Sequence, residues 1–144
     1  DSVGFVNDEV LAEFEKIERI RPYLAARARE IAEHNAKFGA DKSHPINGRH
    51  MTNLGVFRAY AHAYLEEHPL ISNAHTLMVR QLPVTGQGVP LEIYCFATTI
   101  VWTEYEGIAS DLFDHLIAAA PSFGLNLFQA PTAASVRSGT LPLE

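Results

Sequence analysis

The sequence has little of three features that would narrow its function. It has one cysteine, Cys95, and 11 lysine and arginine residues against 17 aspartate and glutamate residues. It also lacks an apolar run of the ~18 residues that a membrane-spanning helix requires. A single thiol excludes a disulfide framework, and a formal net charge of −6 argues against a nucleic-acid surface. We therefore expect this chain neither to cross a membrane nor to bind nucleic acid.

Apolar residues are abundant and make up 47% of the 144 positions. A chain of this length and composition is expected to form one ordinary domain with its own core. The sequence begins at Asp1 rather than at methionine, and its final residues Leu143-Glu144 resemble a cloning remnant. Both ends suggest a piece of a longer protein.

The chain is organised around a predicted hairpin. Two apolar, β-rich runs, 77–84 and 89–100, flank the turn sequence Thr85-Gly86-Gln87-Gly88. Arg80 and Glu92 are equally distant from this turn and are expected to pair across the two strands. The glycines of the turn lack the third glycine and the following helix of a dinucleotide fingerprint, so they indicate a turn alone.

A helix is predicted directly after the hairpin. Thr103 and Glu106 have the spacing of a capping box, which would close the first turn of a helix over 103–120. The residues that follow recur at helical spacing and predict one apolar stripe. The stripe consists of Tyr105, Ile108, Ala109, Leu112, Leu116 and Ile117.

The region before the hairpin is predicted to be helical. Ser2–Asn7 alternates like a strand end, Asp8 is expected to cap a helix to about Arg19, and Pro22 opens a second helix that Gly39 closes. The turn-rich segment 40–50 is a loop and a candidate hinge. A third helix over 53–67 carries the apolar stripe Phe57, Tyr60, Ala61, Tyr64 and Leu65.

A third strand is predicted over Leu125–Ala130, before Pro131. The expected fold is α+β, a two-layer α/β sandwich of α-β-β-α-β order, ferredoxin-like, preceded by an N-terminal helical connector. The expected regions are the strand end 1–7, the connector and loop 8–50, the α/β domain 51–131 and a flexible tail 132–144.

The strand 89–100 is apolar on both faces. Leu91, Ile93, Cys95 and Ala97 alternate with Tyr94 and Phe96, whereas a sheet covered on one side should alternate apolar with polar residues. The helices 53–67 and 103–120 would cover one face. Either the N-terminal helices or another chain would have to cover the second.

Seven histidines offer candidate chemistry but no complete site. Two pairs, His62 with Glu66 and Asp111 with His115, share helix faces at a spacing of four residues, and two more histidines, His44 and His50, lie in the loop. Zinc needs three or four ligands, and no third ligand follows at motif spacing. Ser110 with Asp111 and His115 lies within two turns of one helix, without an oxyanion-hole motif. We expect no catalytic residue, no metal and no cofactor.

Four motifs in order, MTNLGVFRAYAHAYLEEHP, LMVRQLPVTGQGVPLEIYCFATT, WTEYEGIASDLFDHL and FGLNLFQAPT, resemble one family. They are similar to the cytoplasmic C-terminal region of the miniconductance branch of bacterial small-conductance mechanosensitive channels. The stretch FVNDEVLAEFEKIERIRPYLAARAREIAEHN resembles the connector between the β and α/β domains of that branch. The resemblance covers residues 3–132.

This resemblance implies a parent channel of the bacterial inner membrane that opens under tension during osmotic downshock. The parent would be a homo-oligomer, heptameric in the wider family, and this region would form the wall of its cytoplasmic vestibule. Residues 1–7 would then end a missing β domain. The partners would be further copies and the channel's own membrane and β domains, with no small-molecule substrate.

Glu9, Glu13 and Glu15 are the candidate vestibule charges, because their helix would lie beside the junction with the β domain. We expect the chain in isolation to be monomeric or weakly associated, since the other domains would supply most contacts of the ring. Two alternatives stay open at this point: a free-standing, ligand-binding regulatory domain of ferredoxin-like fold, and a small enzyme that uses His115 and Asp111.

Overall fold

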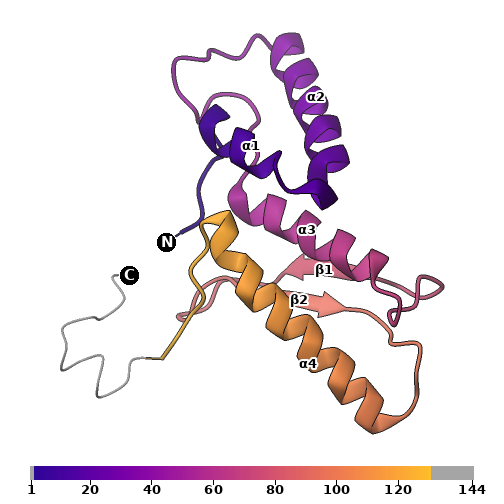
Figure 1. Cartoon of the computed structure of the whole chain (residues 1–144). Helices are drawn as coiled ribbons and strands as arrows, with labels where there is room; N and C mark the ends of the chain where they lie inside the picture. Colours follow the sequence, from indigo (N-terminus) through magenta and orange to yellow (C-terminus); the bar gives the residue numbers. More distant parts are fainter. Residues whose placement is uncertain (1, 131–144) are drawn as a thin grey trace.

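The computed structural model describes residues 2–130, so the predicted tail 132–144 lies outside the described residues. The fold is α+β, as predicted, with a helical upper part and a hairpin flanked by two long helices (Figure 1). The elements in order are α1 (Asp8–Phe14), the 3-10 helix η1 (Glu18–Ile20), α2 (Arg21–Lys37), α3 (Asn53–Glu67), β1 (Met78–Gln81), β2 (Leu91–Tyr94), α4 (Trp102–Ala119) and the 3-10 helix η2 (Ala120–Phe123).

The predicted hairpin and its register are confirmed. Arg80 faces Glu92, and both its Nε and its Nη2 lie 2.8 Å from Glu92 Oε2. The strands are shorter than predicted, because Pro83 and Pro90 lack the N–H groups that a longer ladder would need. Between Pro83 and Pro90 the two arms of the hairpin are still joined at the turn, where Thr85 and Gly88 exchange two backbone hydrogen bonds.

Helices α3 and α4 cover the same face of the sheet, as predicted. Val79 and Ile93 pack against the buried residues of both helices. On the opposite face, the side chains of Tyr94 and Phe96 are 43% and 42% exposed. The N-terminal helices do not cover this second face, because they pack on α3 and η2 instead. In this structure the outer face of the sheet is therefore open.

Helix α3 is the centre of the core. Its predicted stripe is confirmed: Phe57, Tyr60, Ala61 and Leu65 are buried, and Tyr64 is half-buried. The rings of Phe57 and Tyr60 both contact Phe123 of η2, which also contacts Phe14 of α1. These contacts join the N-terminal helices, α3 and the end of α4 into one unit.

Two of the predicted helix starts need correction. Asn7, not Asp8, caps α1, and its Oδ1 accepts from the Val10 N–H over 2.8 Å. The predicted capping box of Thr103 and Glu106 is wrong, because α4 begins at Trp102 without a side-chain cap, which leaves Thr103 already inside the helix. Helix α3 is capped by Thr52, whose hydroxyl accepts from the Gly55 N–H.

The first helix is also shorter than predicted. It ends at Phe14 rather than near Arg19, and Ile17 has an extended backbone that separates it from η1. This break turns Ile20, which is fully buried, toward the core. Burial of a large apolar side chain contributes about 1.5–3 kcal/mol, and the N–H groups of Glu15, Lys16 and Ile17 still find backbone acceptors across the break.

Helix α2 projects from the rest of the molecule (Figure 1). Among its 17 described residues, Leu24 is the one that is buried. Its far end is tied back by Asn35, whose side chain exchanges two hydrogen bonds with the backbone of Arg49. Most of the helix surface therefore faces solvent.

The predicted third strand is absent from the described part of the chain. Gly124, with φ 69°, turns the chain after η2, and Leu125 is buried beneath it. The next residue, Asn126, donates its N–H to the Ser2 hydroxyl rather than to a strand of the sheet. Residues 2–7, predicted as a strand end, form a single antiparallel bridge between Phe5 and Thr52.

Within residues 2–130, no helix combines the length and the apolar composition that a membrane crossing needs.

Candidate functional site

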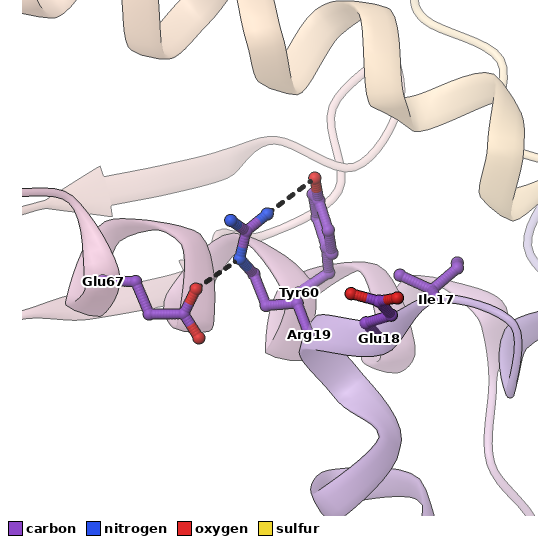
Figure 2. Close-up of a pocket in the computed structure, with 5 residues that line it drawn as sticks. All are labelled: Ile17, Glu18, Arg19, Tyr60 and Glu67. Carbon is purple, nitrogen blue, oxygen red and sulfur yellow. Dashed lines mark hydrogen bonds and ion pairs between the residues drawn. The ribbon is translucent and has the colours of Figure 1, made fainter.

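The main cluster of interacting polar side chains joins η1, α3 and α4. We name it the Arg19 junction, and it consists of Arg19, Tyr60, Tyr64, Glu67 and His115. The Arg19 guanidinium donates from Nε to Glu67 Oε2 over 2.7 Å and from Nη1 to the Tyr60 hydroxyl over 3.4 Å, as Figure 2 shows. Its Cζ also lies 5.2 Å from the centre of the Tyr64 ring, a cation–π distance.

His115 completes the junction from α4. Its Nε2 lies 2.6 Å from the Tyr60 hydroxyl, and its ring stacks on Tyr64 with a centroid distance of 4.0 Å and an interplanar angle of 6°. The two tyrosines are four residues apart on α3, so they share one face of that helix and form a single aromatic platform. Arg19 from η1 and His115 from α4 both rest on this platform.

Charge and burial within the junction favour one set of protonation states. The hydrogen bond to Glu67 raises the pKa of Arg19, so this side chain stays positive. Burial raises the pKa of the Tyr64 phenol, and nearby Tyr60 and Asp111 raise it further while Arg19 lowers it. Tyr64 therefore stays neutral and apolar at physiological pH.

A shallow hollow of about 500 Å³ opens beside the junction, lined by Ile17, Glu18, Arg19, Tyr60 and Glu67 (Figure 2). Arg19 already binds Glu67 and Tyr60 across it, so its donors face partners within the protein. No buried side-chain nitrogen or oxygen in the described range lacks a hydrogen-bond partner. The geometry is that of a structural clamp that joins η1, α3 and α4.

The predicted vestibule charges are only partly brought together. Glu9 and Glu13 are exposed on one face of α1 and line a second hollow of about 580 Å³, with residues of the N-terminal segment and η2. Glu15 lies past the end of the helix, outside that lining, and its backbone carbonyl accepts from Arg21. Lys16 lies 2.6 Å from Glu13 and offsets one of the three negative charges.

The predicted helical histidine pairs have different outcomes. His62 Nδ1 lies 3.9 Å from Glu66 Oε2, so these two side chains form a surface pair. His115 is directed to Tyr60 instead of Asp111. In the described structure Asp111 and His115 are not joined by an ion pair. Among residues 2–130, no three histidine, cysteine, aspartate or glutamate side chains are arranged so that they could hold a metal ion.

The loop histidines His44 and His50 make local contacts within their own turns. His44 accepts from the Ile46 N–H at Nδ1, and His50 contacts the Asn47 carbonyl at Nε2. Ser72 and His75 form a further local contact, with Oγ and Nδ1 2.8 Å apart. The Ser72 hydroxyl also accepts from the N–H of Ala74, a bond typical of a serine turn.

Sequence reasoning did not find the Arg19 junction. The sequence predicts Tyr60 and Tyr64 as part of the apolar stripe of the third helix, and their spacing of four residues indicates a shared face. Arg19 and His115 lie far from the two tyrosines in the sequence. Arg19 reaches them because α1 ends at Phe14 and the chain changes direction before η1. No protein-family model matches the sequence, and no solved structure matches the chain. The resemblance to mechanosensitive channels rests on the sequence motifs alone.

Proposed function

We propose that this chain forms part of the cytoplasmic vestibule wall of a bacterial mechanosensitive channel, in the miniconductance branch of the small-conductance family. Its role there is structural: it shapes the ion path and contacts further copies of the chain around a heptameric ring. The parent protein lies in the inner membrane, with this region on its cytoplasmic side, and protects the cell in osmotic downshock. This role uses no catalytic residue and no cofactor.

The observation that carries the proposal is the open face of the sheet. Tyr94 and Phe96 lie exposed on it, and their rings contact each other at a centroid distance of 5.5 Å. An aromatic surface of this kind on a two-stranded sheet is a favourable place for a subunit contact. Under this proposal the ferredoxin-like order would be completed in the assembly, where 125–130 would add a third strand to a sheet edge.

The ligand-binding alternative expects a polar pocket at a sheet edge. The two hollows lie elsewhere, one between η1 and α3 and the other between the N-terminal segment, α1 and η2. The enzyme alternative needs Asp111 beside His115, and His115 instead binds Tyr60. Neither alternative is favoured by a specific observation.

The test is expression of the complete gene product in a bacterial strain that lacks its own mechanosensitive channels. We expect improved survival after hypo-osmotic shock and a tension-gated conductance in patch recordings. Phe96→Glu should reduce both, because it places a charge on the open face. Ile46→Glu is the matched control, since Ile46 is an exposed apolar residue in the loop between α2 and α3 and is not part of the hairpin. A wild-type protein that gives no tension-gated conductance would refute the proposal.

A further inference from the structure

Helix α4 carries a second apolar stripe that nothing covers in the described structure. Ile108, Leu112 and Leu116 are buried against the core. Trp102 and Phe113 are 72% and 57% exposed, and Tyr105 and Ile117 are also exposed. Trp102 and Phe113 are 11 positions apart in the sequence, which is about three helical turns, so they lie on one side of α4. This outer stripe differs from the buried one and is free to contact another element.

The outer stripe of α4 has an acidic border. Glu104, Glu106, Asp111 and Asp114 lie in this helix, and the sequence Trp102–Ala119 contains no lysine or arginine. At about 100° per residue, Glu106 and Asp114 lie beside the stripe, whereas Glu104 and Asp111 lie on the opposite side of the helix. An element that covers the stripe would therefore place its own residues beside two carboxylates. Such an element should be basic, because opposite charges at an interface steer association and like charges oppose it.

Helix α2 has the matching properties. It carries four basic residues (Arg21, Arg27, Arg29 and Lys37) against two acidic ones (Glu30 and Glu33). Its apolar side is half-exposed at Tyr23, Ala28 and Ile31, because Leu24 is its buried residue in the described structure. Isolated helices of about this length are marginal in water, so a covering partner would stabilise it.

The two helices do not meet within one chain. Helix α2 lies at one end of the molecule, beyond α3, and the Trp102 end of α4 lies at the other (Figure 1). The base of α2 follows Ile20, which is fully buried, so α2 is held at its own end of the molecule. If α2 is the element that covers the outer stripe of α4, it must therefore be the α2 of a second molecule.

We infer that α2 of one copy docks on the outer stripe of α4 of a second copy. The two contacting surfaces differ, so the association is head-to-tail and generates a ring or an open chain of copies. This inference rests on the proposed function for one point, the association of identical copies, and it adds which surfaces meet. Exposed charge pairs are individually weak, so this interface is compatible with the weak association that we expect of this chain alone.

Disulfide trapping with the whole chain tests the pairing. In a Cys95→Ser background, Ala32→Cys places a thiol on α2 and Ala109→Cys places one on α4. The two variants carry different mass tags and are mixed at high concentration under mild oxidation. We expect mixed α2–α4 dimers to exceed both kinds of same-variant dimer. Gln87→Cys, at the hairpin turn, is the control partner and should give mixed dimers only at the background rate.

Charge reversal then tests the recognition. Arg27→Glu with Arg29→Glu on the α2 copy should lower the yield of mixed dimers by about threefold or more, since each exposed pair contributes modestly. Glu106→Lys with Asp114→Lys on the α4 copy should restore that yield. Circular dichroism of each variant checks that it is folded, so that a lost dimer is not mistaken for a lost fold.

Three results would overturn the inference. They are a mixed yield no higher than that of the Gln87→Cys control, a predominance of α4–α4 dimers, and charge reversal without effect or rescue. A tension-gated conductance from the complete gene product together with any of these results would leave the proposed function standing and reject only this interface. Trapped α2–α4 dimers without a conductance would support the interface and reject the channel.

Discussion

The hydroxyl of Tyr60 lies 2.6 Å from Nε2 of His115, and this one buried residue of α3 thereby holds α4 in place. Arg19 of η1 donates to the same oxygen over 3.4 Å. A phenol oxygen can donate one hydrogen bond and accept another, so the two contacts are compatible when the hydroxyl donates to Nε2 of His115. The connector, α3 and α4 are thus aligned by a single side chain.

Removal of that hydroxyl should weaken the fold. Tyr60→Phe keeps the ring in the core but deletes the bonds to His115 and Arg19, so we expect a loss of about 1 kcal/mol in the free energy of unfolding. Urea unfolding followed by circular dichroism measures it. Tyr64→Phe is the matched control, because the hydroxyl of Tyr64 makes no hydrogen bond in the described structure, and its effect should be smaller. Equal effects of the two variants would show that the hydroxyl contacts of Tyr60 are unimportant.

The ion pair between Arg19 and Glu67 should contribute little by itself. Both side chains are partly exposed, so a double-mutant cycle with Arg19→Met and Glu67→Gln should give a coupling below about 1 kcal/mol. Added salt should reduce it further by screening. Arg19→Met alone should cost more than Glu67→Gln alone, since Arg19 also contacts both tyrosine rings. A larger effect from Glu67→Gln would contradict this account.

The acidic residues of α1 should influence ion selectivity if the proposed function is correct. Carboxylates that line an ion path enrich cations, so changing Glu9, Glu13 and Glu15 to Gln should shift the reversal potential of the full channel toward lower cation preference. The shift should be largest at low ionic strength, where screening is weakest. Glu15→Gln alone should contribute least, because it lies outside the hollow that Glu9 and Glu13 line. No shift at low salt would end this hypothesis.

Cys95 should react slowly in the folded protein. Burial raises the pKa of its thiol above the usual 9.0, so the reactive thiolate is scarce at neutral pH. Alkylation by iodoacetamide, followed by mass spectrometry, should be much faster in urea than in buffer at pH 7. The folded state keeps the proton longer than the unfolded state does, so this residue also lowers stability as the pH rises through 9. Equal alkylation rates with and without urea would show that Cys95 is freely accessible.

The parts of the fold that were predictable depend on local chemistry. The stripe of α3 and the pairing of Arg80 with Glu92 follow from periodicity and from the turn between the strands, and both are confirmed. The start of α4 was not predictable from spacing alone. Thr99 donates its hydroxyl to Glu104 and accepts from the Val101 N–H, so the polar contacts at this helix start involve a residue outside the expected box.

The remaining differences depend on tertiary contacts. Leu125–Ala130 has the composition of a strand, but burial of Leu125 and the bond from Asn126 to Ser2 direct the chain to the N-terminal segment. The Arg19 junction joins residues from three elements distant in the sequence, and neither periodicity nor motif spacing reports such a meeting. Long-range packing decided both outcomes.

The placement of α2 gives it the mechanics of a lever. It is fixed at its base by Ile20 and the Arg19 junction, and it extends over 17 residues, a length of about 25 Å at 1.5 Å per residue. A tilt of about 10° at the base would move the far end by roughly 4 Å over that length. The loop after α2 would move with it, because Asn35 near the far end exchanges two hydrogen bonds with the backbone of Arg49. A small rotation at the base of α2 would thus be amplified at the far end of the helix and in the loop that follows it.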